Sequence, residues 1–126
     1  MNGTVLVIDD EAHIREVVVA ALEALTECTV LSASSGESGQ VMALQHQPDM
    51  ILLDVMMPEL DGPATLACLK ALPATAHIPV IFLTAKVQQS DIDNYRSLGV
   101  AGVVPKPFDP MRLPHLIQQA LGTVTA

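Results

Sequence analysis

Five polar side chains of this sequence come directly or shortly after short apolar segments. They are Asp9, Asp10, Asp54, Thr84 and Lys106. Three carboxylates gathered in one place repel each other and raise at least one pKa unless a cation lies among them. A small, hard divalent cation with oxygen ligands meets this need, and Mg²⁺ typically binds one or two carboxylates together with a substrate phosphate. The set therefore indicates chemistry on a phosphoryl group.

Within this chemistry the carboxylate of Asp54 would be the nucleophile, forming an acyl phosphate. The ammonium group of Lys106 and the Mg²⁺ ion would neutralise charge on the phosphoryl oxygens, and the hydroxyl of Thr84 would donate a hydrogen bond to one of them. Each residue alone has a simpler interpretation, since acids favour the first turn of a helix and threonine often caps one. The functional interpretation depends on all five side chains lying together.

Short apolar segments and longer periodic segments alternate along the chain and would position these side chains. The apolar segments are continuous, which is typical of strands buried on both faces of a parallel sheet. They cover residues 5–8, 29–33, 50–53, 80–83 and 100–104.

Helical periodicity follows each apolar segment. It predicts helices over residues 11–25, from Pro63 to about 72, from about 92 to a C-cap at Gly99, and from 113 to a stop at Gly122. The segment 35–45 is a weaker helix, because it contains two glycines after its serine cap. The alternation predicts an open α/β sheet with right-handed crossovers, whose sites lie at the carboxyl ends of the strands.

Composition restricts the class of protein. The chain has 126 residues, half of them apolar, and a net charge of −8. We expect one domain over residues 1–126, with its core at about 4–121. The acidic charge argues against direct nucleic-acid binding. We expect no membrane span and no signal peptide, and we expect Cys28 and Cys68 to be reduced, so the expected location is cytoplasmic.

Four motifs together resemble the receiver domains of two-component response regulators, including the single-domain chemotaxis type. They are Val-Ile-Asp-Asp-Glu at 7–11, Asp-Val-Met-Met-Pro-Glu-Leu-Asp-Gly at 54–62, Leu-Thr-Ala-Lys at 83–86 and Lys-Pro-Phe at 106–108. The resemblance implies a flavodoxin-like five-stranded parallel sheet of order 2-1-3-4-5, with helices on both faces.

The resemblance also implies roles for individual residues. Asp10, Asp54 and the backbone carbonyl of Met56 would bind Mg²⁺, and Asp9 would hold a metal-bound water. Asp54 would accept a phosphoryl group from a sensor histidine kinase or a histidine phosphotransfer protein. The peptide bond before Pro107 is expected to be cis.

A receiver is a signalling switch in phosphorelay signal transduction that catalyses only its own phosphorylation and dephosphorylation. Its output would act through a downstream protein target or a separate output domain, with homodimerisation as a further option. One position departs from the family pattern. Val103 stands where receivers usually have an aromatic residue that reports the phosphorylated state, so the usual route of transmission is in doubt.

Three other functions fit part of the pattern. A phosphohydrolase of the haloacid dehalogenase type would also use Asp54 as its nucleophile, but it needs a second acid two residues later, where this sequence has Met56. A docking module of receiver shape would use no phosphate at all, and the complete set of polar side chains argues against it. A nucleotide-binding flavodoxin relative is weaker still, because no glycine-rich loop follows the first strand.

Overall fold

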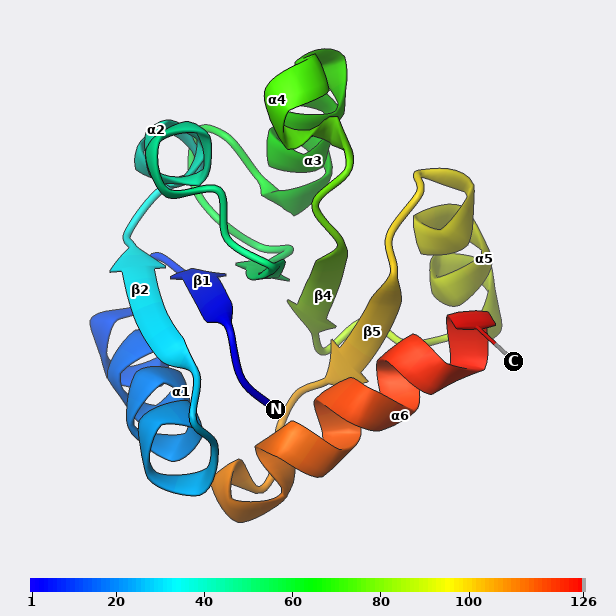
Figure 1. The fold of residues 1–126 in the computed structure, drawn as a ribbon. Coiled ribbons are helices and arrows are strands. Elements are labelled where there is room, and N and C mark those ends of the chain that lie inside the picture. Colours follow the sequence, from blue (N-terminus) through cyan, green and yellow to red (C-terminus); the bar gives the residue numbers. More distant parts are fainter. Residues whose placement is uncertain (126) are drawn as a thin grey trace.

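Five parallel strands form the centre of the structure, in the spatial order β2-β1-β3-β4-β5 (Figure 1). The computed structural model describes residues 1–125, with side chains described for residues 1–122. The strands are β1 (Thr4–Ile8), β2 (Thr29–Ala33), β3 (Met50–Asp54), β4 (Val80–Thr84) and β5 (Gly102–Pro105). The predicted strand order is therefore confirmed.

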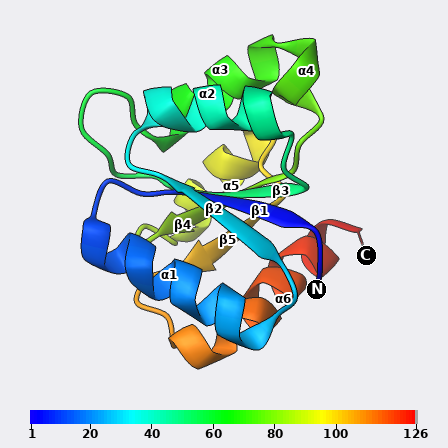
Figure 2. The same cartoon turned by 60° about the vertical axis from the view of Figure 1, so that its left-hand side comes forward.

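Helices cover both faces of this sheet, which Figure 2 shows nearly edge-on. The helices α1 (Ala12–Leu25) and α6 (Leu113–Thr125) pack on one face, with a short 3₁₀ helix, η1 (Pro110–Arg112), before α6. The other face carries α2 (Gly36–His46), α3 (Gly62–Ala71), α4 (Pro73–Ala76) and α5 (Gln89–Ser97). No described helix is long and apolar enough to cross a membrane.

The strands supply side chains to two cores in alternation, as the two-residue period of a strand requires. In β1, Leu6 and Ile8 enter the core under α2, α3 and α5, whereas Val5 and Val7 enter the core under α1 and α6. All residues of β3 and β4 are buried. This two-sided burial explains why their sequences are continuous apolar runs instead of alternating ones.

The helix α2 forms despite its glycines because a serine caps its start and its packing on β1 needs Gly39. Ser35 caps the helix, accepting a hydrogen bond from the backbone N–H of Ser38 while the Ser38 hydroxyl accepts one from that of Ser35. A Cβ atom at Gly39 would lie 2.4 Å from Cδ1 of Ile8, so only glycine lets α2 pack this closely on β1. Packing therefore outweighs the low helix propensity of glycine.

Two predictions of helix limits were tested with different outcomes. Gly99 has a φ of +92°, the left-handed conformation expected of a glycine after a helix, and it follows α5 as predicted. The predicted stop at Gly122 was wrong, because α6 continues to Thr125. A Cβ atom at Gly122 would have no neighbour within 4 Å, so the glycine reflects no close approach of another segment. The short helix α4 was not predicted.

Candidate functional site

The carboxyl ends of β1, β3 and β5 bring three of the predicted polar side chains into contact. The Nζ atom of Lys106 lies 2.9 Å from Oδ1 of Asp54 and 3.5 Å from Oδ2 of Asp9. Asp9 is fully buried and Asp54 is 3% exposed. Because the parallel strands end at one edge, residues separated by almost the whole chain meet there.

Burial and charge act in opposite directions on the pair formed by Asp54 and Lys106. Burial raises the pKa of Asp54, and the negative charges of Asp9 and Asp10 raise it further, whereas the hydrogen bond and charge of Lys106 lower it; the net result is a raised pKa. Burial lowers the pKa of Lys106, but its hydrogen bond to Asp54 and the nearby acids outweigh this and raise it. Lys106 therefore stays protonated beside Asp54.

Asp10 completes a group of three carboxylates suited to a metal ion. Ligand oxygens of Asp9, Asp10 and Asp54 lie within 4.8 Å of one another. The Oδ1 atom of Asp10 is buried and has no hydrogen-bond partner among the described residues. An unpaired buried carboxylate oxygen is unfavourable unless a cation or water binds it. Since all three donors are hard oxygens, the residues present fit Mg²⁺.

Two backbone contacts fix the turn that carries the first two acids. Oδ1 of Asp9 accepts a hydrogen bond from the backbone N–H of Glu11 at 2.9 Å. The guanidinium of Arg15, one turn into α1, donates to the backbone carbonyl of Asp9 at 2.8 Å. Arg15 was not identified from the sequence, because its hydrogen-bond partner is a backbone carbonyl and no residue type marks such a partner.

Thr84 ends β4 and is buried, but it has no hydrogen bond with Asp54 in the described part of the chain. Its Oγ1 atom instead accepts a hydrogen bond from the backbone N–H of Lys86 at 3.0 Å. The hydroxyl proton of Thr84 has no acceptor among the described residues, so it is available to a ligand at the site.

The loop after Asp54 is closed at its base by close backbone packing. The N–H of Gly62 donates to the carbonyl of Val55 at 2.9 Å, and a Cβ atom at residue 62 would lie 2.8 Å from the Asp54 carbonyl oxygen. The side chain of Met56, within this loop, is 67% exposed. The Met56 side chain therefore lies mostly in solvent, while the predicted binding of metal by its carbonyl stays a prediction.

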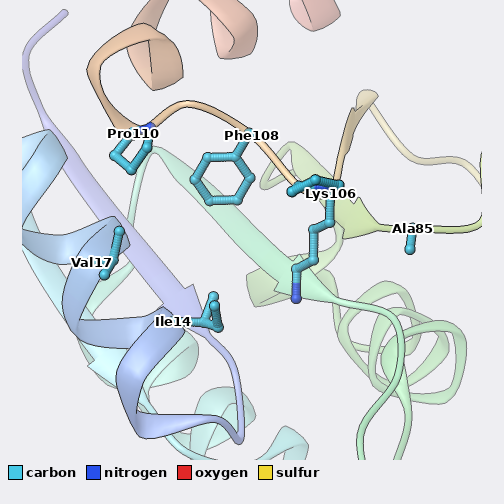
Figure 3. Close-up of a pocket in the computed structure, with 7 residues that line it drawn as sticks. Ile14, Val17, Ala85, Lys106, Phe108 and Pro110 are labelled. Atoms are coloured by element: carbon cyan, nitrogen blue, oxygen red, sulfur yellow. The ribbon is translucent and has the colours of Figure 1, made fainter.

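The loop from β5 to α6 forms one wall of an apolar pocket beside the acidic site (Figure 3). The pocket has a volume of about 300 Å³, and Ile14 and Val17 of α1 face Phe108 across it. The aliphatic stem of Lys106 lines the pocket while its amino group extends to the two aspartates. The Lys106–Pro107 peptide bond is cis, as predicted.

Comparison with known proteins places this geometry in a family. The model of the response regulator receiver domain matches residues 5–118. The phosphate regulon transcriptional regulatory protein PhoB of Pseudomonas aeruginosa is 38% identical over 114 residues, which are 90% of this chain and 49% of that protein. The transcriptional regulator RpaA of Synechocystis is 41% identical over 106 residues, 83% of this chain and 43% of that protein. The chain thus spans about half the length of these relatives.

Solved structures with the same fold include complete receivers. The chemotaxis response regulator CheY4 of Vibrio cholerae has a TM-score of 0.85 at 27% identity, covering 96% of this chain and all of that one. The receiver domain of the sensor histidine kinase PA1611 from Pseudomonas aeruginosa has a TM-score of 0.82 at 27% identity, covering 97% and 99% of the two chains. That receiver holds a magnesium ion in its active-site cleft.

Proposed function

Since this chain belongs to the family of response regulator receiver domains and acts in phosphorelay signal transduction, we propose that Asp54 is its phosphoacceptor. The contact of Lys106 with both Asp54 and Asp9 is the observation that supports this best. It joins the ends of three strands and leaves Asp54 as a buried carboxylate with a cation beside it. A nucleophile with these neighbours suits the transfer of a highly charged group.

In the proposed reaction a carboxylate oxygen of Asp54 attacks the phosphorus of a phosphohistidine. The new O–P bond forms as the P–N bond breaks, and the bonding electrons leave with the imidazole nitrogen, which takes up a proton. The ammonium of Lys106 balances charge on Asp54 and the phosphoryl oxygens, and the Thr84 hydroxyl donates its unused proton to one of these oxygens. Water later attacks the phosphorus of the acyl phosphate, which releases inorganic phosphate and restores the Asp54 carboxylate.

The metal site follows from the same residues. Asp10 and Asp54, with the Met56 carbonyl, would hold Mg²⁺ directly, and Asp9 would hold one of its water ligands. When bound there, Mg²⁺ supplies positive charge to the phosphoryl oxygens. The unpaired Oδ1 atom of Asp10 and the magnesium in the related PA1611 receiver support this assignment.

The partners are proposed at the level of class. The donor is a sensor histidine kinase or a histidine phosphotransfer protein, and the output is a downstream protein or an output domain. We propose that residues 1–126 form one receiver domain and that its location is cytoplasmic. Formation of a homodimer is one way in which it could produce its output. Direct binding of nucleic acid does not fit the net charge of −8.

We propose that the chain does not act as an enzyme on other substrates. The position two residues after Asp54 is Met56, whose exposed side chain supplies no acid for a leaving group. Repeated turnover of a small phosphoester would favour a phosphohydrolase instead. A protein with neither Mg²⁺ affinity nor a response to a phosphoryl mimic would be a docking module.

The test is the labelling of the purified protein with acetyl phosphate, followed by intact mass. We expect a Mg²⁺-dependent gain of one phosphoryl group in the wild type and none in Asp54→Asn. Asp93→Asn, the same change at an exposed residue of α5, serves as the control and should label normally. Label that persists in Asp54→Asn would disprove the assignment of the phosphoacceptor.

A further inference from the structure

Tyr95 is the one buried residue of α5, and its ring and hydroxyl make separate contacts. The ring packs edge-on against Phe82 of β4, with centroids 5.2 Å apart and an interplanar angle of 84°. The hydroxyl donates a hydrogen bond to the backbone carbonyl of Lys86 at 3.1 Å. Tyr95 therefore attaches α5 both to the central sheet and to the loop that follows β4.

The same loop residue is bonded to the candidate site. The backbone N–H of Lys86 donates to Oγ1 of Thr84, while the carbonyl of Lys86 accepts from Tyr95. The hydroxyls of Thr84 and Tyr95 are therefore both hydrogen-bonded to the backbone of Lys86. A shift of Lys86 would change both hydrogen bonds. The Lys86 side chain itself is exposed and takes no part in either bond.

The position opposite Phe82 on the neighbouring strand offers no alternative connection. Val103 of β5 pairs with Phe82 in the sheet register and packs against the same core as Tyr95. It has no ring and no polar side-chain atom, and its χ1 angle is restricted by branching at Cβ. The aromatic side chain that connects this part of the core to the site loop is therefore on α5.

We propose that Tyr95 is a positioning residue that couples the site to α5 through Lys86. In the unphosphorylated protein its hydroxyl holds the Lys86 carbonyl, and the Lys86 N–H holds Thr84. When the Thr84 hydroxyl turns to a phosphoryl group on Asp54, Lys86 shifts, the bond to Tyr95 breaks and the start of α5 is released. This inference rests on the proposed function, because it requires a phosphoryl group at Asp54.

Thermodynamic linkage makes the coupling measurable either at the phosphorylation site or at Tyr95. If phosphorylation breaks the bond between Tyr95 and Lys86, then removing that bond beforehand must favour the phosphorylated arrangement by the same amount. A hydrogen bond of this kind corresponds to about a two- to ten-fold change in an equilibrium constant. Loss of the Tyr95 hydroxyl should therefore tighten the binding of a phosphoryl mimic instead of weakening it.

The first measurement uses the wild-type protein. The chain contains one tyrosine and no tryptophan, so Tyr95 supplies nearly all of its near-ultraviolet fluorescence. We expect this emission to change when beryllofluoride, a phosphoryl mimic, is added in saturating amounts with Mg²⁺. Mg²⁺ alone should leave it nearly constant, because Thr84 turns only toward a phosphoryl group.

The second measurement compares variants by calorimetric titration of beryllofluoride in the presence of Mg²⁺. Tyr95→Phe keeps the ring on Phe82 and should bind the mimic about two- to ten-fold more tightly. Ser97→Ala removes a hydroxyl-to-carbonyl bond from the same helix, that of Ser97 to Asn94, and should bind as the wild type does. A destabilised site would bind the mimic more weakly, so tighter binding separates positioning from a structural defect.

The outcomes separate this inference from the function on which it rests. Acetyl phosphate labelling of the wild type is measured first. No labelling would contradict both the proposed function and the coupling through Tyr95. If Asp54 is labelled but the tyrosine emission stays constant with beryllofluoride, the coupling is wrong and the function stands. Unchanged or weaker binding of the mimic to Tyr95→Phe would overturn the coupling in the same way.

Discussion

The helices α1 and α5 both begin at the edge of the sheet that carries the site, yet they are attached to the protein very differently. The helix α1 has 14 residues, buries Val18, Ala21 and Leu22, and contacts the site through Arg15. The helix α5 has nine residues and buries only Tyr95. One neighbour of the site is therefore anchored along its length, and the other is held mainly at one side chain.

This difference indicates where a change at the site can be transmitted. Movement of α1 would disturb a whole row of core contacts, which costs several times the free energy of one hydrogen bond. Movement of α5 disturbs the ring contact and the hydroxyl bond of Tyr95, together with the partly buried Ile92. The α1 side is thus suited to keep the acids of β1 in place, while the α5 side is suited to respond.

The largest expected effect on this comparison comes from shortening one apolar side chain in each helix. Leu22→Ala in α1 removes a fully buried side chain and should lower the free energy of unfolding by about 2–5 kcal/mol. Ile92→Ala in α5, at a partly buried position, should lower it by about 1 kcal/mol. Urea denaturation followed by circular dichroism measures both. Equal losses would mean that α5 is as firmly anchored as α1.

A second test concerns the pH dependence of the site between the two helices. The pKa of Asp54 is raised by burial and by its acidic neighbours, so in the metal-free protein it holds a proton over a pH range in which an exposed aspartate does not. Mg²⁺ bound at the proposed site would have to displace that proton. We expect the affinity for Mg²⁺ to fall about ten-fold, or about 1.4 kcal/mol, per pH unit below this raised pKa.

The stability of the metal-free protein should change with the opposite sign. In the window between the usual and the raised pKa of Asp54, the native state binds more protons than the unfolded state, so the free energy of unfolding falls as pH rises. Calorimetry at several pH values measures the affinity, and thermal unfolding measures the stability. Asp54→Asn removes this titration, and an unchanged pH profile in that variant would show that another group is responsible.

The smallest test concerns the start of α5. The side chain of Asp91 accepts a hydrogen bond from the backbone N–H of Gln88, as part of a capping box. Asp91→Ala should weaken the first turn of α5 by about 0.5–1 kcal/mol, because the N–H loses its partner. Hydrogen exchange should become faster in α5 while α1 amides and the urea midpoint hardly change.

The equivalent change in α2 is the matched control for this test. Ser38→Ala removes the partner side chain of the Ser35 cap in a helix that is also packed tightly through Gly39. We expect exchange near residue 35 to rise less than it does at α5. A larger effect in α2 would show that capping, not core anchoring, determines which helix opens.

The sequence predicted the features of the fold that depend on repeated local patterns. Strands buried on both faces appear as continuous apolar runs. The order 2-1-3-4-5 was implied by the resemblance to receiver domains and not by these runs themselves. The meeting of Asp9, Asp54 and Lys106 was predictable because parallel strands share one carboxyl edge. In this respect the site is a consequence of the topology.

The sequence did not reveal features that depend on backbone groups or on close approach. Arg15 and Tyr95 both bind backbone carbonyls, which every residue has, so no residue type marks the partner. The helix α4 is only four residues long and begins at Pro73, where a proline could equally end the previous helix. Gly39 weakens a helix by propensity, and only its distance from Ile8 explains its presence.

The close packing at Gly62 has a consequence for mutational tolerance. A side chain at residue 62 would meet the backbone of Val55 and the carbonyl of Asp54 within 3 Å, while Met56 in the same loop points into solvent. In a library that samples every amino acid at each position, residue 62 should accept almost no replacement and residue 56 almost any. A few residues of loop would thus contain both the strictest and the most permissive positions near the proposed phosphoacceptor.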